Sequence, residues 1–244
     1  MAVLRNINRI INQVASEVGL NKVPDVFASS DPAIQQMITL SNACGTELLS
    51  ERAWERLNQE QVFTTQDGDS GVYDLPEDFA YMVEQTAWDR TNENPLGGPL
   101  SEQMWQWVKS RNLVSSTIYA QFRLNEGKLW LYPQPPPVGV EIAYEYISNY
   151  WVRKDADPEH PTDELAELSD IPRFHHYLFE RLLKLRFLEA KGFDTQASLD
   201  QYRAALEKWS ARDKSSPILS AGMTSGGMTR LLDNCNMPDT GYGQ

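Results

Sequence analysis

One tetrapeptide, Gly68-Asp69-Ser70-Gly71, matches the nucleophile signature of a family of serine proteases. A serine attacks a carbonyl group only when a histidine takes its proton and an acid orients that histidine. In that protease family the histidine precedes the serine, whereas His160, His175 and His176 all follow it here. Gly, Asp and Ser are each favoured in turns. We therefore interpret the tetrapeptide as the turn of a β-hairpin.

Two adjacent histidines raise the question of a metal site. His175 and His176 are followed by Glu180, one helical turn after His176. A metal site needs three or four converging ligands, and the sequence has neither a His-Glu-x-x-His motif nor paired cysteines. The spacing therefore predicts a His–Glu pair on a helix surface and no metal.

The stretch from Asp155 to Asp170 contains seven acidic residues, two prolines and no Lys or Arg. Its acids could be calcium ligands or the carboxylate pair of a glycosidase, but the calcium-loop pattern D-x-D-x-D-G is missing. We interpret residues 151–170 as a solvated acidic linker. Cys44 and Cys235 match no metal or disulfide spacing, which is typical of a protein kept in a reducing compartment.

The glycines and the aromatic residues could belong to a phosphate-binding loop or to a base-stacking platform. The glycines from Gly222 to Gly227 have neither a P-loop lysine nor a following helix pattern. Base-stacking platforms interleave aromatic and basic residues. Six aromatic residues lack that pattern and are assigned to core and interface packing: Trp105, Trp107, Trp130, Trp151, Tyr144 and Tyr146. We therefore predict no catalytic residues, no cofactor and no enzyme.

The chain is acidic. Of its 244 residues, 22 are Lys or Arg and 34 are Asp or Glu, which gives a formal net charge of −12. This charge argues against tight nonspecific binding to nucleic acid or anionic membranes. No apolar run approaches the roughly 18 residues of a membrane span, and the N-terminus lacks the pattern of a secretory signal. We therefore expect a protein made in the cytosol.

The N-terminal region has the periodicity of helices. A first helix ends at Gly19 and presents apolar residues at the spacing of one face: Val3, Leu4, Ile7, Ile10, Ile11, Val14 and Val18. A second helix begins at Asp31-Pro32, an N-cap followed by proline, and continues as far as Leu57. Residues 1–60 are therefore predicted to form a helical hairpin.

From Gln61 the hydrophobic period changes from 3.6 to 2, and five or six strands are predicted within residues 61–150. A short helix is expected at residues 101–109, and the proline-rich stretch 133–137 is expected to be an exposed extended loop. The expected strands are 62–65 and 72–75 around the turn at 67–71, then 81–89, 118–124, 128–132 and 140–148. They would form a small antiparallel β-sandwich or barrel.

The C-terminal part returns to helices. One long helix carries Phe174, Leu178, Leu182, Leu185 and Leu188 on one face and ends at Gly192, and a partner helix follows over residues 194–213. The predicted fold class is therefore α+β: a helical bundle of N- and C-terminal helices (1–60 and 171–213) with the β domain inserted between them. Residues 214–244 are predicted to be an extended tail that is disordered or folds against another chain.

The order of these elements and of several short phrases resembles the head-to-tail adaptor proteins of short-tailed, double-stranded DNA phages, also called head completion or tail tubular A-like proteins. The resemblance covers about residues 1–213. Its phrases are Val18-Gly19-Leu20, residues 31–40, 47–54, 75–79 and 95–101, Leu129-Trp130-Leu131-Tyr132-Pro133, residues 144–148, and residues 186–192. These phrases are packing motifs and carry no catalysis.

The resemblance implies a structural virion protein at the head–tail junction, made in the host cytoplasm. It implies a ring, usually of twelve copies, that docks beneath the portal protein, meets the tail tube or nozzle protein, and continues the channel for DNA ejection. Double-stranded DNA would pass through the lumen without specific binding, and no membrane partner is implied. We expect apolar residues of the tail to anchor the ring to the portal: Ile218, Leu219, Met223, Met228, Leu231, Leu232 and Met237.

Two other functions stay open. The chain could be another neck or minor tail structural protein, or a tail-associated cell-wall hydrolase. A hydrolase would need two carboxylates in one cleft, one of them with a raised pKa. The nominal candidates are Glu77 with Asp78, and Glu141 with Glu145.

Overall fold

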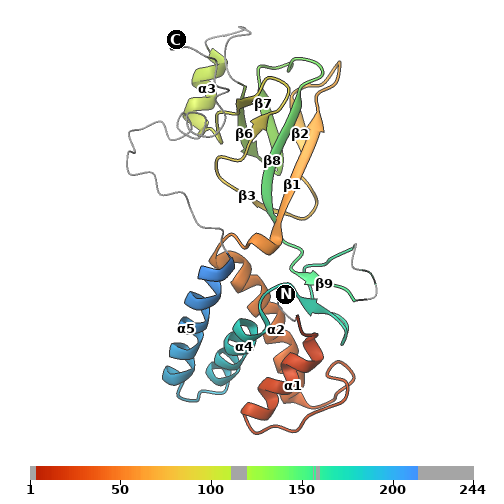
Figure 1. The fold of residues 1–244 in the computed structure, drawn as a ribbon, viewed down its shortest axis with the longest axis vertical. Helices are drawn as coiled ribbons and strands as arrows, with labels where there is room; N and C mark the ends of the chain where they lie inside the picture. The colour runs from red at the N-terminus through yellow and green to blue at the C-terminus, as the bar shows by residue number, and fades with distance from the viewer. Residues whose placement is uncertain (1–3, 111–119, 156, 158–159, 214–244) are drawn as a thin grey trace, which may run out of the picture. The chain divides into compact units, whose positions relative to one another are not determined.

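The computed structural model describes residues 4–110, 120–155, 157 and 160–213. These residues form a mixed α+β fold of five α-helices and antiparallel sheets (Figure 1). The chain divides into two compact units, each described by itself below. The helical unit contains the described residues of 4–59, 78–81 and 146–213, and the β unit contains those of 60–77 and 82–145. Among the described helices, none is both long and apolar enough to cross a membrane.

Side-chain caps begin the first two helices of the helical unit, α1 (Ile7–Glu17) and α2 (Pro32–Glu51). The Asn6 side chain accepts a hydrogen bond from the Arg9 backbone N–H at 3.2 Å, and the Asp31 carboxylate accepts one from Ala33 at 2.8 Å. Gly19 follows α1 with a φ of +81°, a conformation that glycine adopts without strain. The N-cap at Asp31 and the stop at Gly19 are confirmed.

Helix α2 ends at Glu51, six residues before the predicted limit at Leu57. Arg52 is extended, and a separate 3-10 helix, η1, covers Glu55–Leu57. The indole N–H of Trp54 donates to the Leu48 carbonyl at 2.6 Å and so satisfies one of the last carbonyls of α2. The chain turns back over the end of α2 because this contact buries the indole. The apolar pattern alone predicts that the helix continues through these residues.

Helices α4 (His176–Ala190) and α5 (Gln196–Asp213) occupy the two predicted C-terminal positions. Helix α4 begins after Phe174 because His175 has the extended backbone of an N-cap and its ring accepts a hydrogen bond from the Tyr177 N–H. Ahead of α4, the short strands β9 (Val152–Arg153) and β10 (Ile171–Pro172) pair antiparallel.

The aromatic core of the helical unit surrounds Trp151, which is 1% exposed. Its ring stacks on Phe174 and on Phe179, each with 6.0 Å between ring centroids. The same ring lies against Gly45 of α2, where a Cβ atom would approach it to 2.1 Å. Only glycine fits at this position, because interiors of this density leave no room for an added methyl group. Helices α1, α2 and α5 each pack against α4.

The remaining strands form two sheets. The larger sheet has the order β1 (Asn58–Thr64), β8 (Glu141–Ser148), β4 (Trp88–Asp89) and β5 (Asn94–Pro95), and β3 (Phe79–Met82) also pairs with β8. In the smaller sheet β7 (Lys128–Tyr132) lies between β2 (Val72–Asp74) and β6 (Gln121–Asn125), antiparallel to both.

The predicted hairpin of strands 62–65 and 72–75 is wrong. Strand β1 pairs with β8 and strand β2 pairs with β7, so the two strands belong to different sheets. The backbone of Thr65 bonds to Val140, whereas Gly71 accepts a hydrogen bond from the Leu131 N–H. The residues between β1 and β2 do make a turn. Turn residue types do not determine which strands pair, since pairing partners are selected by packing.

Other strand predictions have mixed outcomes. Strands β6 and β7 form the predicted hairpin, and Glu126 and Gly127 at its tip have φ values of +52° and +70°. The single strand predicted at 81–89 is divided into β3 and β4, because Gln85 between them has a φ of +62°, which interrupts extended backbone. Helix α3 (Glu102–Ser110) confirms the predicted short helix.

Candidate functional site

The acid of the protease-like tetrapeptide is engaged within its own loop. The Asp69 carboxylate accepts hydrogen bonds from the Gln66 backbone N–H at 2.7 Å and from the Tyr73 hydroxyl at 2.9 Å. Burial, with the bond to Asp69, raises the pKa of Tyr73. These contacts hold the loop in shape and support its interpretation as a turn.

The predicted surface pair of histidine and Glu180 is wrong. Glu180 is 4% exposed, and its carboxylate pairs with the Arg5 guanidinium at 3.2 Å. Burial raises the pKa of Glu180, and the nearby Arg5 opposes that rise. Glu180 lies on the face of α4 that packs inward. The four-residue spacing from His176 did not indicate which face of the helix is buried. In the described part of the chain, no group of three or more His, Cys, Asp or Glu residues could hold a metal ion.

The acidic stretch is solvated only in part. Asp170 is fully buried, and its carboxylate accepts hydrogen bonds from the backbone N–H groups of Ala166 and Glu167, both at 2.8 Å. The backbone of Asp170 also accepts a hydrogen bond from Ile7 at the start of α1. The expectation of a solvated linker is therefore wrong at this end, where the carboxylate organises a turn. Asp155, Asp157, Asp163, Glu164 and Glu167 are exposed as expected.

The aromatic residues mostly pack in cores, as predicted. Trp105, Trp151, Tyr144 and Tyr146 are each at most 6% exposed, whereas Trp107 is 44% exposed. In the β unit the Trp105 ring meets the Tyr132 ring edge to face at 6.4 Å, and Trp130 packs against the same cluster. Cys44 is buried as well, and burial raises the pKa of its thiol.

The predicted portal anchors, from Ile218 to Met237, all lie outside the described residues. The nominal hydrolase carboxylates have other contacts. The Asp78 carboxylate accepts a hydrogen bond from the Tyr146 hydroxyl at 2.8 Å, and Glu141 lies 3.8 Å from the Arg90 guanidinium. Glu145 lines an open acidic groove of the β unit, discussed below.

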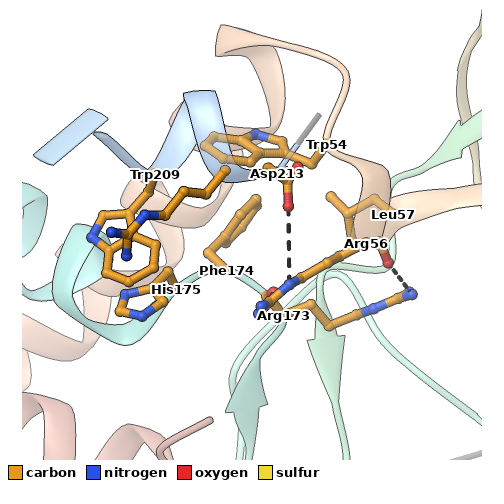
Figure 2. A pocket seen from close by; sticks show the side chains of 9 residues that line it. Trp54, Arg56, Leu57, Arg173, Phe174, His175, Trp209 and Asp213 are labelled. Atoms are coloured by element: carbon orange, nitrogen blue, oxygen red, sulfur yellow. Dashed lines mark hydrogen bonds and ion pairs between the residues drawn. The ribbon is translucent and has the colours of Figure 1, made fainter. Parts of the chain in front are cut away.

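A small pocket in the helical unit combines aromatic rings with guanidinium groups (Figure 2). Three segments far apart in the sequence form it: η1 with the preceding residue, the residues before α4, and the end of α5. Its volume is about 140 Å³. The lining residues are Trp54, Arg56, Leu57, Arg173, Phe174, His175, Trp209, Arg212 and Asp213. We call it the Arg–Trp pocket.

Aromatic rings form the walls of the Arg–Trp pocket. The His175 ring stacks on the Trp209 ring, with 3.2 Å between centroids and 15° between planes. The Trp54 ring meets the Phe174 ring edge to face at 5.6 Å. Figure 2 shows the two pairs of rings on the same side of Arg56 and Arg173. The walls are therefore largely apolar, and the charged residues of the lining supply the groups that can bind a polar ligand.

Three guanidinium groups and one carboxylate line this pocket. Arg173 donates hydrogen bonds to the backbone carbonyls of Tyr150 and Arg56. These bonds hold its guanidinium in place, and neither of the two acceptors is a carboxylate. Arg56 lies 4.0 Å from Asp213, whose other oxygen accepts a hydrogen bond from the Glu55 N–H at 2.9 Å. The charge balance of the lining is therefore positive.

Arg212 is the most available cation of the pocket. Its guanidinium lies 5.0 Å from the centre of the Trp209 ring, and its side chain is exposed. Within the described ranges it forms no ion pair. A guanidinium held against a ring keeps its hydrogen-bond donors free for an incoming anion.

The pKa of His175 reflects its burial and the charges around it. Burial is the largest cause, and together with the neighbouring His176, Arg56 and Arg212 it lowers this pKa to about 4. At neutral pH the imidazole is therefore uncharged, accepts the hydrogen bond that caps α4, and stacks on Trp209. Chemically, this arrangement can bind an anion.

Sequence reasoning missed the Arg–Trp pocket because residues 54–57 are separated from its other two parts by more than 100 residues. One local signal was present: Trp209 and Arg212 are three residues apart on a predicted helix and so share a face. The partners of that face, Arg56 and His175, come from segments whose pairing no local pattern encodes.

Two broader grooves have opposite charge. In the helical unit, a groove of about 530 Å³ beside α1 is lined by Arg5, Arg9 and Lys22 together with amide side chains. In the β unit, a groove of about 720 Å³ is lined by four acidic residues and one arginine: Glu60, Asp89, Glu93, Glu145 and Arg90. Cationic surfaces are therefore concentrated in the helical unit of an otherwise acidic chain.

The chain matches a known protein family. Residues 5–222 match the sequence profile of the family described as SU10 adaptor protein. No curated protein matches the chain. The match covers nearly all of the helical and β units described above.

Proposed function

Because this chain belongs to the SU10 adaptor protein family, we propose that it is a structural protein of the phage virion that joins the portal to the tail. In this proposal, twelve copies form a ring beneath the portal, meet the tail tube or nozzle protein, and continue the DNA channel. The observation that carries the proposal is the family match over residues 5–222, which spans both units. Membership of an adaptor family indicates a structural, non-enzymatic role.

The size of the chain supports a ring. A compact chain of 244 residues has a radius of gyration of roughly 18 Å, too small for one copy to surround a DNA duplex. Head-to-tail contacts that close on themselves generate a ring wide enough to do so.

We assign the parts of the ring by the predicted domains. Residues 1–60 and 171–213 would build the ring body as a helical bundle, and residues 61–150 would project from it as a small β-sandwich or barrel. Residues 151–170 would connect the two, and residues 214–244 would form an extended tail that attaches to the portal. Deleting residues 215–244 should leave the fold intact and weaken portal attachment. A truncated protein that docks normally would contradict the assignment of the tail.

The charge of the chain supports passage of DNA without tight binding. Each copy has a formal charge of −12, so a ring concentrates negative charge around the lumen. An acidic wall repels phosphate and lets the duplex slide. We propose that acids outnumber bases on the lumen. A ring structure with a lumen lined mainly by Lys and Arg would contradict this.

Native mass spectrometry of the protein alone and with its cognate portal ring tests the proposed function. We expect monomers alone and a twelve-copy ring on the portal. A protein that leaves the portal unoccupied at any ratio would overturn the proposal. A turbidity assay on peptidoglycan tests the hydrolase alternative, and we expect no clearing.

A further inference from the structure

The Arg–Trp pocket has the chemistry to hold a carboxylate side chain. Its volume of about 140 Å³ is several times the roughly 30 Å³ that one water occupies in the liquid, so it has room for one side chain and not for a helix. Aromatic walls pack against the methylene groups of Asp or Glu, while a guanidinium donates two parallel hydrogen bonds to the carboxylate.

The cationic side of this contact is Arg212. It is exposed at the end of α5 and held near the Trp209 ring, and the part of the chain that the structure describes gives it no ion pair. Arg56 already faces Asp213 and Arg173 already bonds to two carbonyls, so both strengthen the field without being displaced.

The helical unit also presents the complementary charge. Asp155, Asp163 and Glu164 are exposed in the connection between β9 and β10, and among the described residues none of them forms an ion pair. This connection is part of the stretch that contains no Lys or Arg. Figure 1 shows α5 and β9 on opposite sides of the helical unit. The α5 side of the positive pocket and the negative loop that follows β9 therefore lie on different sides of one copy.

A ring requires such a pair of surfaces. In a head-to-tail ring each copy contacts its neighbours through two non-identical patches, so complementary charges must lie on different sides of one subunit. We propose that the Arg–Trp pocket of one copy receives the carboxylate side chain of Asp155, Asp163 or Glu164 from the next copy. This inference rests on the proposed ring and names its subunit contact.

Charge reversal at the pocket is the first test, read by native mass spectrometry of ring assembly on the cognate portal. Arg212→Glu should raise the concentration needed for half-assembly by at least about tenfold, because a buried charge partner is lost and a repulsion is added. Lys208→Glu is the matched control. Lys208 also lies near the Trp209 ring on α5, at 5.9 Å, but does not line the pocket. It should assemble within about twofold of the wild type.

The partner is tested by reversing the charges on both sides. Asp163→Arg with Glu164→Arg should impair assembly as Arg212→Glu does, and combining all three substitutions in one chain should restore it. The same number of reversals at Asp67 and Glu84, two exposed acids of the β unit, should have no effect and should not rescue Arg212→Glu. Circular dichroism and urea unfolding of each variant separate loss of contact from loss of fold.

A direct readout comes from Arg212→Lys treated with a zero-length carbodiimide in mixed ¹⁴N and ¹⁵N rings. We expect an amide link between position 212 and the carboxylate of Asp155, Asp163 or Glu164 that joins the two isotopes. Rings that form normally with Arg212→Glu, a link to a portal carboxylate, or failure of the triple variant to recover would each overturn this inference while leaving the ring intact. Absence of wild-type rings on the portal would instead overturn the proposed function.

Discussion

The helical unit and the β unit are held together by contacts of different range. In the helical unit, the Trp151 core and three sets of ion pairs join residues that are more than 100 positions apart: Arg5 with Glu180, Glu17 with Arg181 and Lys184, and Glu47 with Arg186. In the β unit, strands β2, β4, β5, β6 and β7 have two to five residues, and several turns contain residues with positive φ. The helical unit is thus held together across long sequence distances, and the β unit depends more on local turn geometry.

The substitution Gly45→Ala, which adds a methyl group to the core of the helical unit, should have the largest effect on stability. A Cβ there would lie 2.1 Å from the Trp151 ring, so the core must shift and the free energy of unfolding should fall by at least about 3 kcal/mol. Urea unfolding followed by hydrogen exchange of separate peptides measures the loss in each unit. Thr46→Ala, on the exposed face of the same helix, is the control and should cost less than about 0.5 kcal/mol. Equal exchange in Gly45→Ala and wild type would refute the role of this core.

The second prediction concerns pH and the helical unit. The folded state lowers the pKa of His175 from 6.5 to about 4, so the unfolded chain binds the additional proton between these values. Stability from the neutral imidazole is therefore fully present above pH 6.5 and is lost as pH falls toward 4. His175→Asn keeps an N-cap acceptor for Tyr177 and should flatten this part of the stability profile. A His175→Asn profile identical to that of the wild type between pH 4 and 6.5 would contradict the account.

The third prediction compares ion pairs in the two units. Arg186 pairs with Glu47 across α4 and α2, and both side chains are about one-third exposed. A double-mutant cycle of Glu47→Gln and Arg186→Gln should give a coupling of about 1 kcal/mol. The pair Arg123–Glu102 of the β unit spans 3.5 Å with Glu102 86% exposed, and its cycle should give less than about 0.3 kcal/mol. A larger coupling in the β unit would reverse the comparison.

The smallest expected effect is a gain at the β6–β7 turn. Glu126 holds a φ of +52°, which Asn tolerates better than Glu, so Glu126→Asn should stabilise the β unit by about 0.5 kcal/mol. Hydrogen exchange of the β6–β7 peptides should slow in this variant. Glu84→Asn is the matched control at ordinary φ and should produce no slowing. Loss of protection in Glu126→Asn would show that the turn does not limit this unit.

Some features of the protein follow from local sequence alone. Helix periodicity, the cap at Asp31-Pro32, the stop at Gly19 and the turn before β7 were predictable, because each depends on residues a few positions apart. The α+β class and the resemblance to phage adaptors follow from the order of such elements. The observed helices and antiparallel sheets agree with the class, and the family match agrees with the resemblance.

The tertiary structure alone decided the rest. The early end of α2 depends on Trp54 covering Leu48, the partners of β1 and β2 depend on β8 and β7, and Glu180 lies inside because Arg5 reaches it. The Arg–Trp pocket is assembled from three segments that share no local pattern. Residue types and spacing determine which elements form, but the energies that select among pairings come from burial and charge contacts between distant residues, which exist only once the chain is packed.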